Sequence, residues 1–289
     1  MKKKKIDYAK QFLKEEGSMF RCPTCLSGFK GLDETSLLCP KGHRYNISKK
    51  GTIHFPDHPM TTDYDLAMLT HRRHMILEGL YNQVLEAIIT MLPEVTEDSV
   101  MIDLGCGEGS FLKQLTDLGH LPGKKMGFDL SKDGVQLASD YSDMAFWFLG
   151  DVTSVPVLDD RVDVLFNIFS PVQYSEVKRL LKKDGVIVKV IPNEHYLKEL
   201  RELFYRDNVE KQHYSNEKVY EKFKKELVVV TERDITYQYP ISQEKYEHVL
   251  KMSPVHWGAS EASRNYAASH YFDALTIDVK ILIGKTSRE

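Results

Sequence analysis

The stretch Val100-Met-Ile-Asp103-Leu-Gly105-Cys-Gly107-Glu-Gly109 decides the fold class. Its first half predicts a short apolar strand, and a helix is expected to follow through about Leu118, so the glycine loop joins a strand to a helix. Glycines at such a turn let the backbone approach a ligand without interference from Cβ atoms. The G-x-G-x-G spacing differs from the G-x-G-x-x-G of dinucleotide dehydrogenases. The loop therefore predicts a cofactor site of another kind.

Acidic residues stand at the ends of three successive predicted strands. Asp103 stands just before the loop and either holds it or binds a cationic amino group of the ligand. Asp129 lies 22 residues after Gly107 and is placed to accept hydrogen bonds from ribose hydroxyls. Asp151 follows the third strand, where a carboxylate can accept from an adenine amino group. Helix capping remains the alternative for both Asp129 and Asp151.

The flanking sequence alternates between strand and helix signals. Apolar strands separated by helix-length segments predict a Rossmann-like, doubly wound α/β sheet that is covered on both faces. Predicted strands are Val100–Leu104, Lys125–Leu130, Ala145–Leu149, Val162–Phe169, Gly185–Ile191, 225–239 and 271–284, and helices are predicted at 74–92, 173–182, 194–205, 242–252 and 260–268. We expect a frayed or weakly helical start over 1–18.

The composition suits a globular protein with one large and one small domain, since 42% of the 289 residues are hydrophobic and 28% are charged. We place the boundary at 60/61, in a linker from Met60 to Asp65. No run of 18 apolar residues and no signal peptide occurs, which favours the cytoplasm and no membrane.

The charge is divided unevenly between the two parts. Residues 1–60 carry 12 Lys+Arg and 6 Asp+Glu, whereas residues 61–289 carry 27 and 36. The positive N-terminal part favours a polyanionic partner, and a solvated lysine tail without a partner is the alternative.

Four residues in the N-terminal part have the spacing of a zinc site. Cys22-Pro-Thr-Cys25 is followed after 13 residues by Cys39-Pro-Lys-Gly-His43. The C-x2-C and C-x3-H turns each supply one pair of ligands, and tetrahedral Zn²⁺ accepts three sulfurs and one nitrogen. Four protein ligands leave no open position, so we expect a structural ion that supports the folding of this short segment. A redox C-x-x-C pair is the alternative.

These features together resemble class I methyltransferases that use S-adenosylmethionine (SAM), and more narrowly the RlmA family of 23S rRNA (guanine-N1) methyltransferases. The resemblance covers nearly the whole chain. Beside the zinc set and the glycine loop it includes Arg72-Arg73, Gly79-Leu-Tyr81 and Met252-Ser-Pro-Val-His-Trp257. It implies methylation of one guanine in a domain II hairpin near the peptide exit tunnel, and one branch of the family is tied to resistance to tylosin-type macrolides.

The resemblance also implies cofactor contacts. The family has a histidine contact after the fifth strand, where this chain reads Pro192-Asn-Glu-His195-Tyr196, so either His195 or Tyr196 takes that place. Cys106 has no Cys/His/Asp partners for nucleophilic catalysis and is interpreted as a loop filler. The expected cofactor-binding residues are Tyr81, Asp103, Gly105, Cys106, Gly107, Glu108, Gly109, Asp129, Leu130, Asp151, His195 and Tyr196.

Guanine N1 carries a proton, so methylation requires a general base or support for the O6 anion. Asp163 and His195 are the candidate bases, although the sequence does not identify one. Phe169, at the end of the fourth strand, is expected either to stack on a base or to pack the sheet end. His256 and Trp257 are candidates for lining the base pocket, and Arg72 and Arg73 for phosphate contacts.

Two other functions remain open. The first is a small-molecule methyltransferase whose zinc site only supports folding, and the second is a non-enzymatic ribosome-binding factor. The charge of residues 1–60 argues against the first, and the complete loop with Asp103 and Asp129 argues against the second. A homodimer is an expectation that the sequence does not decide.

Overall fold

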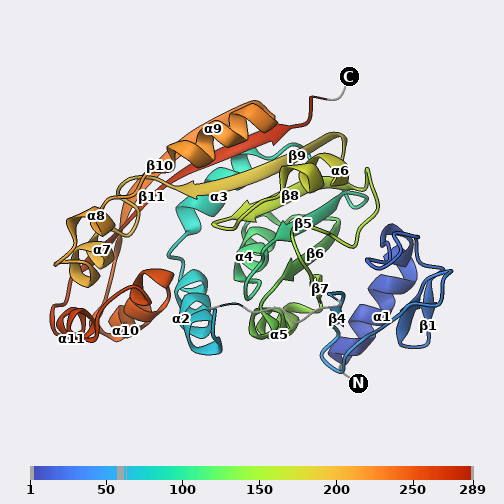
Figure 1. Ribbon diagram of the computed structural model, residues 1–289, viewed down its shortest axis with the longest axis horizontal. Coiled ribbons are helices and arrows are strands. Elements are labelled where there is room, and N and C mark those ends of the chain that lie inside the picture. Colours follow the sequence, from blue (N-terminus) through green and yellow to red (C-terminus); the bar gives the residue numbers. More distant parts are fainter. Residues whose placement is uncertain (1–2, 57–61, 63, 288–289) are drawn as a thin grey trace.

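An eight-stranded sheet forms the centre of the computed structural model, which describes residues 3–56, 62 and 64–287 (Figure 1). The strand order is β10-β11-β9-β8-β5-β6-β7-β4. Neighbouring strands from β9 to β4 are parallel, whereas β11 runs antiparallel to both β9 and β10. The strands are β4 (Ile53–His54), β5 (Val100–Leu104), β6 (Lys124–Asp129), β7 (Phe146–Leu149), β8 (Val162–Ile168), β9 (Leu181–Pro192), β10 (Val228–Pro240) and β11 (Ala274–Lys285). This arrangement confirms the predicted α/β class.

Each face of the sheet has its own hydrophobic core. Alternate residues of a strand point to opposite faces, so Met101 of β5 joins one core and Ile102 the other. Both faces are buried, which explains why the central strands are continuous apolar runs. The longer helices are α1 (Lys5–Glu16), α2 (Leu66–Leu77), α3 (Asn82–Met91), α4 (Ser110–Gly119), α5 (Lys132–Ala138), α6 (Tyr174–Leu180), α7 (Lys198–Phe204), α9 (Glu217–Glu226), α10 (Gln243–Lys251) and α11 (Glu261–Ser269).

The helix predicted at 74–92 is two helices, α2 and α3. Gly79 separates them with a φ of +89°, a left-handed conformation that glycine adopts without strain. The apolar spacing continues across this glycine and no proline interrupts it, so the sequence pattern alone did not reveal the break. The break places Tyr81 at the start of α3.

Helix α9 was not predicted. The pattern after residue 205 predicts no helix, and it predicts a strand from 225, whereas β10 begins at Val228. Only Phe223 of α9 is buried, and seven of its ten residues are Lys or Glu, so its apolar stripe is short. A shorter helix, α8 (Val209–Gln212), precedes it with no buried residue.

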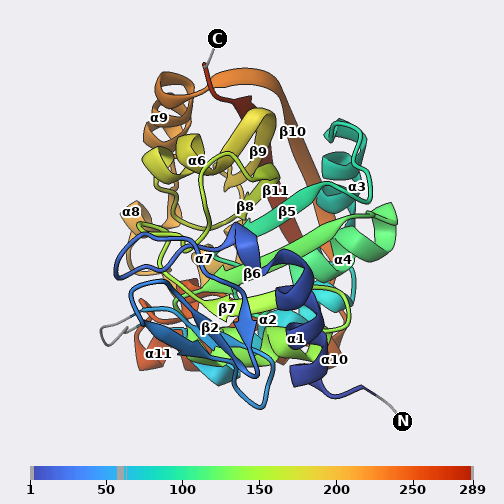
Figure 2. The same cartoon turned by 90° about the vertical axis from the view of Figure 1, so that its right-hand side faces the viewer.

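Of the two alternatives predicted for residues 1–18, the helical one is seen in α1, which packs with the rest of the N-terminal segment as a compact layer against the sheet. In α1, Ala9 and Leu13 are buried. Phe20 and Phe55 pack against Phe148 in one aromatic cluster. The short strands β1 (Leu32–Asp33), β2 (Ser36–Leu38) and β3 (Arg44–Asn46) form a separate small sheet. Figure 2 shows these segments in front of β6 and β7.

The N-terminal layer and the main sheet share one hydrophobic core, and β4 pairs with β7 as the edge strand. Half of the predicted linker, Met60 to Asp65, falls outside the described residues, and so does the predicted boundary at 60/61. Within the part of the chain that the structure describes, no helix is long and apolar enough to cross a bilayer.

Candidate active site and metal centre

The glycine loop lies at the carboxyl end of β5 and is held by Asp129. Gly105, Gly107 and Gly109 all have positive φ values, between 55° and 82°. Asp129 Oδ2 accepts from the Gly107 amide at 2.8 Å, and Oδ1 accepts from the Ser131 amide at 2.7 Å. Ser131 is the residue that caps α5, because its Oγ accepts from the Gly134 amide. Asp129 therefore fixes the loop from the neighbouring strand.

Asp103 is a buried carboxyl beside the loop, with only 2% of its surface exposed. Burial raises the pKa of Asp103 to about 8, and the nearby Asp129 and Glu108 carboxyls add to this effect. The described residues give its side chain no hydrogen bond. Glu108 is also buried and its Oε1 has no partner. Buried carboxyls of this kind suit a cationic ligand group, because such a group supplies both a positive counter-charge and hydrogen-bond donors.

The cavity at the loop fits the cofactor of a class I methyltransferase. Gly105, Gly107, Asp129 and Leu130 line it together with Arg72 of α2. A Cβ added to Gly107 would meet no atom within 4 Å, so the backbone there faces open space. A Cβ on Gly105 would lie 1.9 Å from Ser170 Oγ, so a side chain at this position would clash with Ser170.

Gly107→Ala should weaken SAM binding by at least about tenfold while changing thermal stability little. The new methyl group enters the open cavity, and the cost of a positive φ for alanine is about 1 kcal/mol. Calorimetric titration with SAM and a melting curve measure the two quantities. Gly31→Ala is the matched control, because Gly31 also has a positive φ and open space but lies far from the loop in sequence. Equal SAM affinity in both variants would contradict this assignment of the cavity.

A second, larger cavity of about 640 Å³ adjoins the first. Five residues border both: Tyr64, Arg72, Phe169, Ser170 and Pro171. Phe169 stacks on Tyr196 with ring centres 5.1 Å apart, and the hydroxyls of Tyr196 and Tyr81 lie 2.6 Å from each other. Phe169 has a φ of +57°, which is rare for a bulky residue and is typical of functional sites.

The structure corrects two predicted site residues. Asp163 lies at the amino end of β8, opposite the cofactor loop, where it accepts from the Val100 amide and pairs with Lys182. It is a structural ion-pair partner rather than a base. His195 is exposed and borders neither cavity, because the backbone turns after β9 and directs Tyr196 inward instead. Of the two residues left open after the fifth strand, Tyr196 is the one at the cavity.

Other predicted residues divide between the cavity and its surroundings. Cys106 is buried and contacts the glycine loop itself, as expected of a filler. Asp151 accepts from the Thr153 amide and borders neither cavity. Trp257 packs edge-on against Tyr64.

Two further candidates are engaged elsewhere. His256 packs against Phe204 and does not line the base pocket. Arg73 pairs with Asp140 at 2.8 Å and stacks over Tyr141, so it is not free for phosphate. Arg72, in contrast, lines both cavities.

Lys189 is a site residue that sequence reasoning missed. It lies within β9, is 3% exposed and lines the larger cavity. Burial lowers the pKa of Lys189 to about 8. The available signal was a single lysine among apolar residues in the strand predicted at Gly185–Ile191, since charged residues are seldom fully buried without a partner.

The predicted metal ligands converge. The ligand atoms of Cys22, Cys25, Cys39 and His43 all lie within 4.8 Å of one another. Cys25 Sγ is 3.7 Å from Cys39 Sγ, and Cys22 Sγ is 3.5 Å from His43 Nδ1. Zinc–ligand bonds of about 2.0 to 2.3 Å in a tetrahedron require ligand separations of roughly 3.5 to 3.8 Å. The four cysteines of the chain form no disulfide, so the set fits a structural Zn²⁺.

Comparison with known proteins agrees with this geometry. A family of methyltransferase domains matches residues 96–251. A Bacillus subtilis protein named "Putative 23S rRNA (guanine-N(1)-)-methyltransferase YxjB" is 34% identical over 275 residues, which cover 92% of this chain and 97% of that protein. The chain belongs to the family of 23S rRNA (guanine-N1) methyltransferases. A member from Streptomyces fradiae, the 23S rRNA (guanine(748)-N(1))-methyltransferase, is 24% identical over 62% of this chain and 65% of its own.

Solved structures share the fold at low sequence identity. A methyltransferase bound to the Haloferax volcanii Trm112 activator covers 79% of this chain and 100% of its own, with a TM-score of 0.51 and 18% identity. Phosphoethanolamine N-methyltransferase 2 of Haemonchus contortus with bound S-adenosyl-L-methionine covers 78% of this family member and 58% of its own chain, with a TM-score of 0.50 and 16% identity. These similarities concern the fold alone.

Proposed function

We propose that this chain transfers the methyl group of SAM to N1 of a guanine in 23S rRNA. The observation that carries the proposal is the near full-length relationship to a protein named for that reaction. The two adjoining cavities support it, because one has the features of a cofactor site and the other is lined by aromatic rings. Methyl transfer is an in-line displacement, so alignment across the shared wall of the cavities is the main requirement.

Residues of the first cavity would hold SAM, which supplies an electrophilic methyl group on a sulfonium. Beside this cavity, the buried Asp103 would bind the cationic amino group of SAM, and Asp129, which lines the cavity, would bind its ribose hydroxyls. The glycine loop leaves room for the ligand at Gly107. The guanidinium of Arg72 lies close to Glu108 and over the Phe111 ring, where it would meet the carboxylate of the amino-acid moiety.

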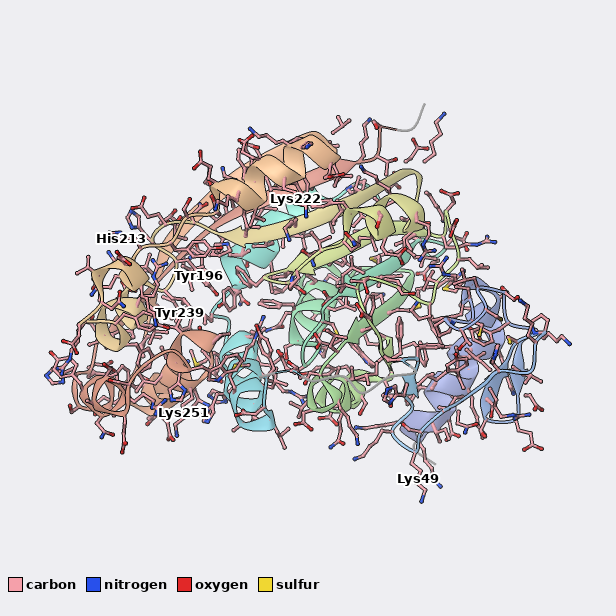
Figure 3. All side chains as sticks on the ribbon, viewed as in Figure 1. Lys49, Tyr196, His213, Lys222, Tyr239 and Lys251 are labelled. Atoms are coloured by element: carbon pink, nitrogen blue, oxygen red, sulfur yellow. The ribbon has the colours of Figure 1, made fainter. Side chains whose placement is uncertain are left out.

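The larger cavity would receive the guanine. N1 lies on the Watson–Crick edge, so the target base must be extruded or unpaired before it reacts. Phe169 and Tyr196 offer stacking surfaces. Lys218 and Lys222 of α9 border the cavity and are exposed, where they would contact the RNA phosphates. Figure 3 shows Lys222 on α9 and Tyr196 below it.

Finer aspects of the function are part of the same proposal. We infer that the zinc layer, with its surplus of Lys and Arg, contacts the RNA and that the protein acts in the cytoplasm, where ribosomes are assembled. Methylation within the domain II hairpin near the exit tunnel, a link to macrolide resistance and a homodimer stay predictions. The family resemblance supports the hairpin and the link to resistance.

Methyl incorporation distinguishes this function from that of a small-molecule enzyme. Purified protein is incubated with radiolabelled SAM and either unmodified 23S rRNA or a metabolite extract free of RNA. We expect label in the rRNA, and 1-methylguanosine as the labelled nucleoside after digestion. Label that enters only the extract would support the small-molecule alternative, and no label in either would support the non-enzymatic one.

A further inference from the structure

The buried amine of Lys189 stands at a junction between the glycine loop and the larger cavity. Its Nζ donates to Asn167 Oδ1 at 2.5 Å and to the Ser170 carbonyl at 3.1 Å. Asn167 cannot turn away, because its Nδ2 donates to the carbonyls of Leu104 and Pro171. Leu104 directly precedes Gly105, so two hydrogen bonds connect the amine to the start of the cofactor loop.

These contacts leave one tetrahedral position of the nitrogen without a partner among the described residues. An ammonium has three N–H groups and the structure gives it two acceptors. A neutral amine would keep both of these donated hydrogen bonds and place its lone pair at the third position. Lys189 lines the larger cavity, so this position is available to a bound base.

The other titratable groups at the larger cavity are poorer candidates for a general base than this amine. Among the described residues that line the larger cavity, none is aspartate, glutamate or histidine. The titratable and charged side chains that line it with Lys189 are Tyr64, Arg72, Tyr81, Tyr174, Tyr196, Tyr214, Lys218 and Lys222. Burial raises the pKa of the phenols of Tyr81, Tyr174, Tyr196 and Tyr214, and Lys218 and Lys222 are exposed on α9.

We propose that Lys189 is the general base that removes the N1 proton of the target guanine. The inference rests on the proposed function. The Nζ lone pair takes the N1 proton and becomes an ammonium held by Asn167 and Ser170. The freed N1 electron pair forms the new N–C bond, while the bond from the methyl carbon to sulfur breaks and its electrons stay on sulfur. The proton then leaves to solvent through the open cavity. A buried amine whose pKa is near 8 has the proton affinity that such a base requires.

Single-turnover methylation of rRNA as a function of pH tests this role. For the unsubstituted protein we expect a rate that rises with pH, has its inflection near pH 8 and levels off above it. Lys189→Met should lose at least about 100-fold in rate and should lack this inflection, while its SAM affinity by calorimetry stays unchanged. Lys189→Arg keeps the charge but cannot act as a base near neutral pH, so it should be equally slow. Lys182→Met is the matched control, because Lys182 lies on the same strand and pairs with Asp163 at the other end of the sheet.

A substrate analogue separates a base from a merely structural lysine. The RNA substrate is a stem-loop in which a single 8-azaguanosine replaces the guanosine that primer extension identifies as the target. The N1 proton of 8-azaguanosine is more acidic than that of guanosine, and its N1 anion is fluorescent. We expect the analogue to restore most of the Lys189→Met rate. Without any methyl donor, the bound analogue should show anion fluorescence at pH 7 with the unsubstituted protein but not with Lys189→Met.

Three results would overturn the role of Lys189 while leaving the proposed function intact. They are a wild-type rate and inflection in Lys189→Arg, no rescue of Lys189→Met by the analogue, and the same anion fluorescence with both proteins. A failure of the unsubstituted protein to methylate rRNA at all would instead refute the proposed function.

Discussion

Asp103→Asn should weaken SAM binding by about two orders of magnitude or more, because breaking a buried charge pair by removing one partner costs about 3–5 kcal/mol. The Asp103 carboxyl is buried beside the glycine loop and receives no hydrogen bond from the described residues, so the ligand's amino group would be its counter-charge. The asparagine side chain keeps the shape of the aspartate but lacks its negative charge. Calorimetric titration with SAM measures the loss, and Asp151→Asn serves as the control, since Asp151 is only partly buried and its carboxylate already accepts from the Thr153 amide.

The same variant has a characteristic pH dependence. Without ligand, the raised pKa means that folded Asp103 keeps its proton up to about pH 8, whereas in the unfolded chain it loses the proton near its ordinary value of 3.8. The free energy of unfolding contributed by this group therefore falls as pH rises from about 4 to 8. Asp103→Asn should lack this fall and be more stable than the unsubstituted protein at pH 8. SAM binding at pH 7 should release a proton, detected as a buffer-dependent enthalpy. A buffer-independent enthalpy would contradict the role of Asp103.

Cys25→Ala should remove the zinc ion and disorganise the N-terminal layer. Binding of a structural Zn²⁺ contributes about 10–16 kcal/mol in small zinc peptides, and three ligands do not close the tetrahedron. We expect zinc content to fall from one ion per chain to near zero and rRNA affinity to fall by at least about tenfold. SAM affinity should change by no more than about threefold, because the proposed cofactor contacts come from β5, β6, their loops and Arg72 of α2, outside the metal-binding layer. Elemental analysis, filter binding and calorimetry measure these three quantities.

Cys106→Ala is the matched control for zinc content, because Cys106 is the one cysteine of the chain outside the metal set. It should retain a full zinc ion. The N-terminal layer shares a core with the sheet, so the melting temperature of Cys25→Ala should also fall. If SAM binding disappeared together with zinc, the separation between a metal-supported layer and a cofactor site would be wrong.

The parts of the fold that follow from local chemistry could be predicted from the sequence. β5 has the predicted bounds, Val100–Leu104, because a fully buried parallel strand is a continuous apolar run that ends at a glycine turn. The metal ligands were predicted because zinc fixes both ligand type and spacing. Asp129 lies beside the glycine loop because β5 and β6 are parallel neighbours whose carboxyl ends meet at one edge of the sheet, and its contact with ribose hydroxyls stays a prediction.

What could not be predicted depends on tertiary contacts. Whether His195 or Tyr196 faces the cavity is set by the turn after β9. The assignment of α9 failed because only Phe223 of that helix is buried. Lys189 was overlooked because its meaning comes from Asn167 and Ser170, which lie about twenty residues away in sequence and touch it only after the strands pair.

Primer extension on 23S rRNA from a strain that lacks the gene tests the proposed methylation most directly. An N1 methyl group blocks base pairing, so it stops reverse transcriptase. We predict that one stop at a guanine disappears in this strain, returns when the unsubstituted gene is supplied, and does not return with Asp103→Asn. An unchanged pattern of stops in the strain without the gene would contradict the account.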